Sequence, residues 1–190
     1  MNRHIEKILI DRNAIARRVA ELADQIAADF RKTAALDEPP HISLVAILTG
    51  SLIFLADLIR HMPLMMRIRL ITVSSYRGAT TAGGDLQLQT TIPDDLAGQH
   101  VLVVDDILDS GKTINAVRDL IHQRRPASLR TCMLLRKQIP SAMNTHADYI
   151  GFDIPNEFVV GYGLDYNGFY RNLPDIVTLK PHILHSGATP

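Results

Sequence analysis

The sequence predicts an α/β fold, with a parallel-sheet core flanked by helices, a small C-terminal hood and a flexible flap. Apolar runs of strand length alternate with amphipathic segments of helical spacing through the middle of the chain. The chain has 190 residues, of which 46% are apolar and 21% charged, enough for one buried core. We therefore expect a single domain over residues 1–190, with a core of about residues 10–138, a flap of about residues 76–90 and a hood of about residues 140–190.

The first half of the chain predicts two helices and two strands. Asp11 is a good N-cap residue, and the apolar side chains after it recur at spacings of three and four over residues 12–32. Residues 43–48 are a continuous apolar run that predicts a central strand, and residues 52–60 predict a short helix after it. Residues 67–75 alternate in polarity well enough for another strand.

In the second half of the chain the alternation continues and then weakens. Residues 76–90 begin with a stretch rich in Gly, Thr and Ala, which predicts a flexible flap or hairpin. Residues 101–104 and 128–135 predict buried strands, and apolar side chains at helical spacing predict a helix between them. Beyond residue 138 only short strands are expected, at residues 149–152, 158–160 and 176–179.

Charge and cysteine content exclude several classes of function. Twenty basic and twenty acidic side chains cancel, so the chain has no overall field that would attract nucleic acid or an anionic membrane. The longest uncharged apolar stretch, residues 42–56, falls short of the roughly 18–20 residues that span a bilayer. The single cysteine, Cys132, rules out an intrachain disulfide and fits a reducing compartment. We expect a cytoplasmic protein with no nucleic-acid or membrane partner.

Residues 101–113 carry the strongest functional signal. Two adjacent carboxylates, Asp105 and Asp106, stand at the end of the expected strand, and a third, Asp109, precedes the small residues of positions 110–113 and the start of a helix. A strand, an acid pair, a loop of small residues and a helix start place backbone N–H groups and hydroxyls around a phosphate. The carboxylates are left beside that phosphate for a sugar, a metal ion or a proton.

A nucleoside-triphosphate loop of the pattern Gly-x-x-x-x-Gly-Lys-Ser/Thr is disfavoured. Residues 111–113 match its last three positions, but Asp106 stands where the first glycine is required. A carboxylate at that position would repel a phosphate and lacks the backbone freedom of glycine.

The pattern instead resembles the 5-phosphoribosyl-1-pyrophosphate (PRPP) site of type I phosphoribosyltransferases, and the likeness extends over about residues 10–180. Further segments resemble hypoxanthine(-guanine) phosphoribosyltransferases in the expected order: the pyrophosphate loop at residues 46–58, the start of the flap at residues 74–76, the purine-reading lysine segment at residues 134–137 and the purine hood at residues 158–174. The resemblance implies the type I phosphoribosyltransferase fold. It also implies transfer of phosphoribose from PRPP to hypoxanthine, and to guanine, which would yield IMP or GMP and pyrophosphate in purine salvage.

The resemblance implies roles for the residues of the PRPP site. Asp105 and Asp106 would contact the ribose hydroxyls, directly or through Mg²⁺ and water. Asp109 would act as general base or acid at the purine N7. The 5′-phosphate would be held by Asp109, Ser110, Gly111, Lys112 and Thr113. The pyrophosphate would be held by Thr49, Gly50 and Arg171, and the flap would begin at Ser74, Ser75 and Tyr76.

Four residues are implied in purine binding. Lys137 would donate to O6 of a 6-oxopurine, Phe158 would stack on the ring, and the backbone of Val159 would read the edge of the base. Asp165 belongs to the same purine hood and would ligate Mg²⁺ through water. Taken alone, these side chains have plainer interpretations as a solvated lysine, core apolar residues and a turn acid.

Position 49 departs from the resemblance. Many relatives carry a basic residue where this chain has Thr49, and a neutral hydroxyl weakens charge compensation there. We therefore expect that loop to rely on backbone N–H groups. The resemblance also implies that the Leu48–Thr49 peptide can be cis.

Two alternative functions stay open. The first is a PRPP-sensing regulator that binds nucleic acid, although the chain has no spare helix-turn-helix segment and no net positive charge. The second is a phosphoribosyltransferase for another base such as xanthine, although residues 158–165 resemble a 6-oxopurine hood. The expected small-molecule partners are PRPP and a 6-oxopurine, the expected cofactor is Mg²⁺, and family analogy implies a homodimer or homotetramer.

Overall fold

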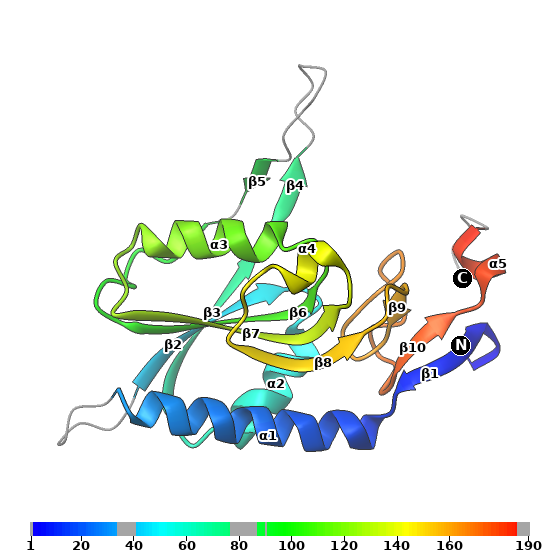
Figure 1. Ribbon diagram of the computed structural model, residues 1–190, viewed down its shortest axis with the longest axis horizontal. Coiled ribbons are helices and arrows are strands. Elements are labelled where there is room, and N and C mark those ends of the chain that lie inside the picture. Colours follow the sequence, from blue (N-terminus) through cyan, green and yellow to red (C-terminus); the bar gives the residue numbers. More distant parts are fainter. Residues whose placement is uncertain (1, 34–40, 77–86, 90, 186–190) are drawn as a thin grey trace.

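The computed structural model describes residues 2–33, 41–76, 87–89 and 91–185 (Figure 1). It confirms the expected α/β architecture, because a five-stranded parallel sheet has helices on both faces. The strands of this sheet, in spatial order, are β3 (Met65–Thr72), β2 (His41–Leu48), β6 (His100–Leu108), β7 (Ser128–Lys137) and β8 (Tyr149–Ile154). One face carries α1 (Arg12–Arg31) and α2 (Leu52–His61), and the other carries α3 (Lys112–His122) and the short α4 (Pro140–Met143).

Two smaller sheets complete the described part of the chain. One is antiparallel, in the order β1 (Ile5–Ile10), β10 (Ile176–Leu179) and β9 (Val159–Val160), with η1 (Asn2–His4) and α5 (Pro181–His185) beside it. In the other, β4 (Ser74–Tyr76) pairs antiparallel with β5 (Gln87–Gln89). The expected hairpin is thus confirmed at its base, and the rest of the expected flap, residues 77–86 and 90, lies outside the described residues.

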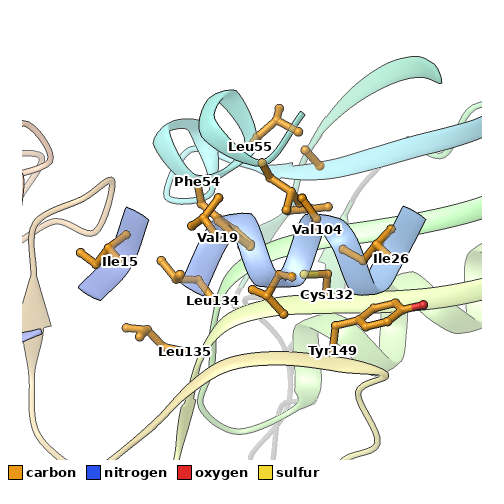
Figure 2. Close-up of a cluster of buried hydrophobic side chains, with 14 of the residues drawn as sticks. Ile15, Val19, Ile26, Phe54, Leu55, Val104, Cys132, Leu134, Leu135 and Tyr149 are labelled. Atoms are coloured by element: carbon orange, nitrogen blue, oxygen red, sulfur yellow. The ribbon is translucent and has the colours of Figure 1, made fainter. Parts of the chain in front are cut away.

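Two apolar layers enclose the large sheet, because side chains alternate between the faces of a strand. On β6, Leu102 and Val104 pack with α1 and α2, whereas Val101 and Val103 pack with α3. Figure 2 shows the first layer, in which side chains of α1 and α2 meet Val104 and residues of β7. Strands that are buried on both faces read as continuous apolar runs, which is why the sequence identifies them. Within the described ranges, every helix is too short or too polar to span a membrane.

Three differences change how the chain divides into sheets. β1 pairs with β10, so the first strand of the chain belongs to the small sheet. β8 pairs with β7, so the large sheet continues beyond residue 138 to Ile154. β6 runs on to Leu108, so Asp105 and Asp106 lie within the strand and not beyond its end. The strand continues because Asp105 and Ile107 remain in register with β7.

Helix α1 begins where the sequence predicts. The Asp11 carboxylate accepts from the backbone N–H groups of Asn13 at 2.8 Å and Ala14 at 3.0 Å, and so satisfies two of the donors that a helix start leaves unpaired. The apolar stripe of the helix, from Ile15 to Phe30, is buried in the layer that also contains α2.

Replacing Asp11 with alanine is expected to lower the free energy of unfolding by about 1 kcal/mol, because both capping hydrogen bonds are lost. Urea titration followed by circular dichroism measures the change. Asp11→Asn keeps an acceptor and should recover most of the loss, and Asp24→Ala on the exposed side of the same helix should have little effect. An Asp11→Ala protein as stable as the wild type would contradict the capping role.

Candidate active site

A cavity of about 470 Å³ opens at the carboxyl ends of the parallel strands. It is lined by residues 47–50 at the end of β2, by residues 105–114 from β6 into α3, and by Asp165 and Arg171 from the connection between β9 and β10. Ligands of open parallel sheets bind at this edge, where the loops that follow the strands converge. Two further lining residues that the sequence did not single out are Val73 and Met133.

The loop of residues 109–113 turns β6 into α3 through a glycine. Gly111 is the N-cap residue and has a φ of 78°, a left-handed conformation that favours glycine. A Cβ at this position would lie 2.2 Å from Oγ1 of Thr145, so the loop closes against Thr145 only without a side chain. Gly111 has no side chain to accept from the first N–H groups of α3, and the Lys112 N–H has only a long bond, of 3.4 Å, to Oγ of Ser110; such donors suit an anion in the cavity.

Asp105 and Asp106 form an acid pair at the floor of the cavity. Asp105 is 6% exposed and accepts from the N–H of Asp106 at 3.0 Å, and the partly buried Asp106 accepts from the N–H of Ile107 at 2.9 Å. Burial, and then the charge of Asp106, raise the pKa of Asp105 well above its usual range. Burial also raises the pKa of Asp106. Two carboxylates whose ionised forms are disfavoured in this way provide a favourable place for a cation.

The loop after β2 touches this acid pair directly. A Cβ on Gly50 would lie 1.6 Å from Oδ2 of Asp106, so any other residue there would force the Asp106 carboxylate or the loop to shift. A Cβ on Gly163 would lie 2.0 Å from the carbonyl oxygen of Gly50. Asp106, Gly50 and Gly163 are therefore stacked in contact. The Leu48–Thr49 peptide beside them is cis, as the resemblance implied.

Arg171 brings a guanidinium to the cavity and is held in place by two partners. Its Nη2 lies 2.7 Å from Oδ1 of Asp165, and its Nη1 donates to the carbonyl of Gly163 at 2.7 Å. The other Asp165 oxygen accepts from the N–H of Gly168 at 2.7 Å. A planar fork held in this way suits phosphate oxygens. Asp165 is thus engaged in the free protein, and any metal ligation by it must share or release these contacts.

Of the four residues expected at the purine, Asp165 lines this cavity, whereas Lys137, Phe158 and Val159 do not. Lys137, at the end of β7, pairs through Nζ with Oδ2 of Asp109 at 2.9 Å, and its side chain is 13% exposed against 51% for Asp109. Phe158 is 45% exposed, and its ring meets that of Tyr166 edge-on with centroids 5.7 Å apart. Val159 lies in β9, in the small sheet. The Lys137–Asp109 ion pair therefore connects the expected purine segment to the phosphate loop.

Residues that support the loop from outside were missed by sequence reasoning. Ser141 donates through Oγ to the carbonyl of Asp109 at 3.3 Å, and Thr145 donates through Oγ1 to the carbonyl of Ser141 at 2.8 Å. Pro140 in the first turn of α4 is a recognisable helix-start signal. Nothing in the local sequence links that helix to the loop, because the contact forms only when the chain folds.

The sequence matches the phosphoribosyl transferase domain over residues 7–167. The chain belongs to this family. The hypoxanthine-guanine phosphoribosyltransferase of Mycobacterium avium is 41% identical over 181 residues, which cover 94% of this chain and 88% of that protein. The hypoxanthine phosphoribosyltransferase of Haemophilus influenzae is 39% identical over 173 residues, which cover 91% of this chain and 94% of that protein.

Solved structures of this phosphoribosyl transferase family agree with the fold. The hypoxanthine phosphoribosyl transferase of Trypanosoma cruzi matches with a TM-score of 0.85 and 38% identity, covering 96% of this chain and 95% of that one. The expected type I phosphoribosyltransferase fold is confirmed. These relatives are transferases, so the alternative of a nucleic-acid-binding regulator is not favoured.

In the free protein, without Mg²⁺, Asp105→Asn is expected to raise the thermal midpoint at neutral pH. The raised pKa of Asp105 means that folding favours the protonated carboxyl, so its ionisation costs stability. This loss of stability is absent below the pKa that Asp105 has in the unfolded chain, and it grows as the pH rises towards the pKa of Asp105 in the folded protein. The increase in thermal midpoint given by Asp105→Asn should therefore become smaller as the pH is lowered.

Thermal melts with a chelator at several pH values measure the effect of Asp105→Asn. Asp119→Asn, which changes an exposed carboxylate on α3, is the matched control and should leave the midpoint unchanged. A variant that melts below the wild type at neutral pH would show that the ionised Asp105 is not a cost to the fold.

Proposed function

We propose that the protein transfers phosphoribose from PRPP to hypoxanthine, and also to guanine, and releases IMP or GMP and pyrophosphate in purine salvage. The main support is that a single cavity is lined by the acid pair, the loop of residues 109–113, the turn of Thr49 and Gly50, and Arg171. A point mutant of the related Trypanosoma cruzi enzyme has a solved structure in complex with the product IMP, and this chain matches that structure with a TM-score of 0.84 at 38% identity.

PRPP lies along the cavity in this proposal. The 5′-phosphate accepts from the N–H groups at the start of α3 and from the hydroxyls of Ser110 and Thr113. The ribose hydroxyls donate to Asp105 and Asp106. The pyrophosphate lies by Gly50. Backbone N–H groups and the Arg171 guanidinium there balance its negative charge, which the neutral Thr49 cannot do.

Mg²⁺ is the cofactor in this proposal. Among the described residues, no group of three or more His, Cys, Asp and Glu side chains could by itself hold a metal ion. That agrees with the preference of Mg²⁺ for one or two carboxylates completed by substrate oxygens and water. Asp105 and Asp106 suit this role because burial raises the pKa of both carboxyls and a bound cation would favour their ionised forms, and Asp165 offers a further carboxylate. When bound, the ion neutralises the oxygens of the leaving pyrophosphate.

Asp109 and Lys137 have separate roles at the purine, one at N7 and the other at O6. Lys137 pairs with Asp109 in the free protein; when a 6-oxopurine enters, the ammonium donates to O6 and Asp109 holds the proton at N7 while N9 attacks the anomeric carbon. The exposed ring of Phe158 stacks on the base, and the backbone of Val159 reads its edge. An ammonium finds an acceptor at O6 but none at the 6-amino group of adenine, which favours 6-oxopurines. Xanthine also carries O6, so Lys137 does not exclude it.

The surroundings of the site complete the proposal. The flap that begins at Ser74, Ser75 and Tyr76 closes over the reacting centre and excludes water. In this proposal the protein is cytoplasmic and forms a homodimer or homotetramer. Apolar side chains that α2 and the edge strand β3 expose support the oligomer. These side chains are Leu52, Ile53, Met65, Ile68 and Leu70. Sedimentation velocity distinguishes a dimer from a tetramer and from a monomer.

Asp109→Ala is expected to lower kcat for IMP formation by about 10²- to 10⁴-fold, because proton transfer at N7 is lost. Equilibrium binding of PRPP, measured by calorimetry, should remain largely in place because the loop amides are unchanged. Asp119→Ala on α3 removes an exposed carboxylate and serves as the control. Wild-type turnover by Asp109→Ala would reject the general acid or base assignment.

Lys137→Ala is expected to lower kcat/KM for hypoxanthine and guanine by about 10- to 100-fold, because a charge-assisted hydrogen bond to O6 is removed. The KM for PRPP should change little. The assay uses PRPP and Mg²⁺ with hypoxanthine, guanine, xanthine, adenine and uracil, and Lys32→Ala on the protein surface is the control. An unchanged kcat/KM for hypoxanthine argues against the O6 contact, and a wild-type protein that forms no nucleotide from any base would overturn the proposed function.

A further inference from the structure

A partly buried hydrogen bond joins helix α2 to the connection between β9 and β10. The hydroxyl of Tyr162 donates to Oδ2 of Asp57 at 2.7 Å, and Tyr162 is 7% exposed. Burial raises the pKa of Tyr162, so its hydroxyl remains a donor throughout the neutral range. The other oxygen of Asp57 accepts from Arg60 at 2.6 Å, which leaves Oδ2 directed at the tyrosine. Tyr162 also has a φ of 50°, a conformation rare for tyrosine that needs support from its surroundings.

The residue after Tyr162 lies directly on the pyrophosphate loop. Gly163 contacts the carbonyl of Gly50 so closely that a Cβ on Gly163 would lie 2.0 Å from that oxygen. Gly50 in turn leaves no room for a side chain beside Asp106. A displacement of Tyr162 would therefore also displace Gly163, Gly50 and the acid pair, because these groups are already in contact.

Gly163 also determines where Arg171 lies. The N–H of Gly163 donates to the backbone carbonyl of Arg171 at 2.9 Å, and the Arg171 guanidinium donates back to the carbonyl of Gly163 at 2.7 Å. The same guanidinium holds Asp165 at 2.7 Å. The position of the cationic fork therefore follows the position of Gly163, one residue from the Tyr162 tether.

We propose that Tyr162 and Asp57 are positioning residues that set Arg171 and Asp165 against the pyrophosphate loop. Neither side chain lines the cavity of the acid pair; both line a second cavity, of about 280 Å³, and Arg171 lines both cavities. They act through Arg171 and not on the substrate. Because Thr49 is neutral, Arg171 carries more of the charge compensation at the pyrophosphate, so its placement matters more. This inference depends on the assignment of pyrophosphate to Arg171 in the proposed function.

Tyr162→Phe removes only the hydroxyl and tests the tether. The KM for PRPP, and the KM for pyrophosphate in the reverse reaction, are expected to rise about tenfold, the lower end of the range for one lost hydrogen bond to a charged group. The KM for hypoxanthine should stay within about twofold, because the purine contacts lie on β7 and at Phe158. A merely structural role would not separate these constants.

Variants of Asp57 check that the two residues act as a pair. Asp57→Asn keeps an oxygen acceptor and should remain close to the wild type, whereas Asp57→Ala should raise the KM for PRPP as Tyr162→Phe does. The double variant Tyr162→Phe/Asp57→Ala should be no worse than either single variant, because the same interaction is removed. Fully additive effects would mean that the two side chains act separately, and would overturn the pairing.

Tyr149→Phe is the matched control. Tyr149 is 6% exposed and also donates to a carboxylate, Oδ2 of Asp29 at 3.0 Å, but it lies at the start of β8, away from the cavity. It should change the thermal midpoint about as much as Tyr162→Phe and leave the KM for PRPP unchanged. If Tyr162→Phe also leaves that constant unchanged in an active protein, the positioning role alone is overturned. A wild-type protein that forms no nucleotide overturns the proposed function itself.

Discussion

The pair of carboxylates at the end of β6 is the feature on which the rest of the site depends. Asp105 and Asp106 lie next to each other within a strand that is still paired with β7, so the sheet holds two like charges where burial disfavours them. The neighbouring groups leave room for the two carboxylates and place hydrogen-bond donors near them. Gly50 approaches Asp106 without a side chain, and the loop of residues 109–113 presents amide donors from the start of α3. A site with concentrated anionic character is thereby prepared for a cation and for hydroxyl donors.

The stability that offsets these buried charges comes from the layers behind them. Each face of β6 is covered, on one side by α1 and α2 and on the other by α3, and a fully buried aliphatic side chain contributes about 1.5–3 kcal/mol. The acids occupy only the last part of the strand, at the edge where the helices begin. A rigid apolar interior can therefore support a polar site at its margin without becoming polar itself.

The charge balance of the site is local although the chain as a whole is neutral. Arg171 enters the cavity from the connection between β9 and β10, and its partners Asp165 and Gly163 hold it beside the turn of Thr49 and Gly50. Lys137 enters from β7 and rests on Asp109. Two cations from separate parts of the chain are thus each paired with an acid of the site, an arrangement that a count of charges would not reveal.

The sequence by itself determined the elements that depend on local pattern. Helical periodicity and Asp11 placed α1, continuous apolar runs placed β2, β6 and β7, and the acids and small residues of positions 105–113 indicated the phosphate loop. It did not determine that β1 pairs with β10, that β8 extends the large sheet, or that Thr145, Tyr162 and Asp57 support the site. Each of these contacts joins residues far apart in the chain and leaves no periodic or capping signal at either end. Only the packing of the folded chain could decide them.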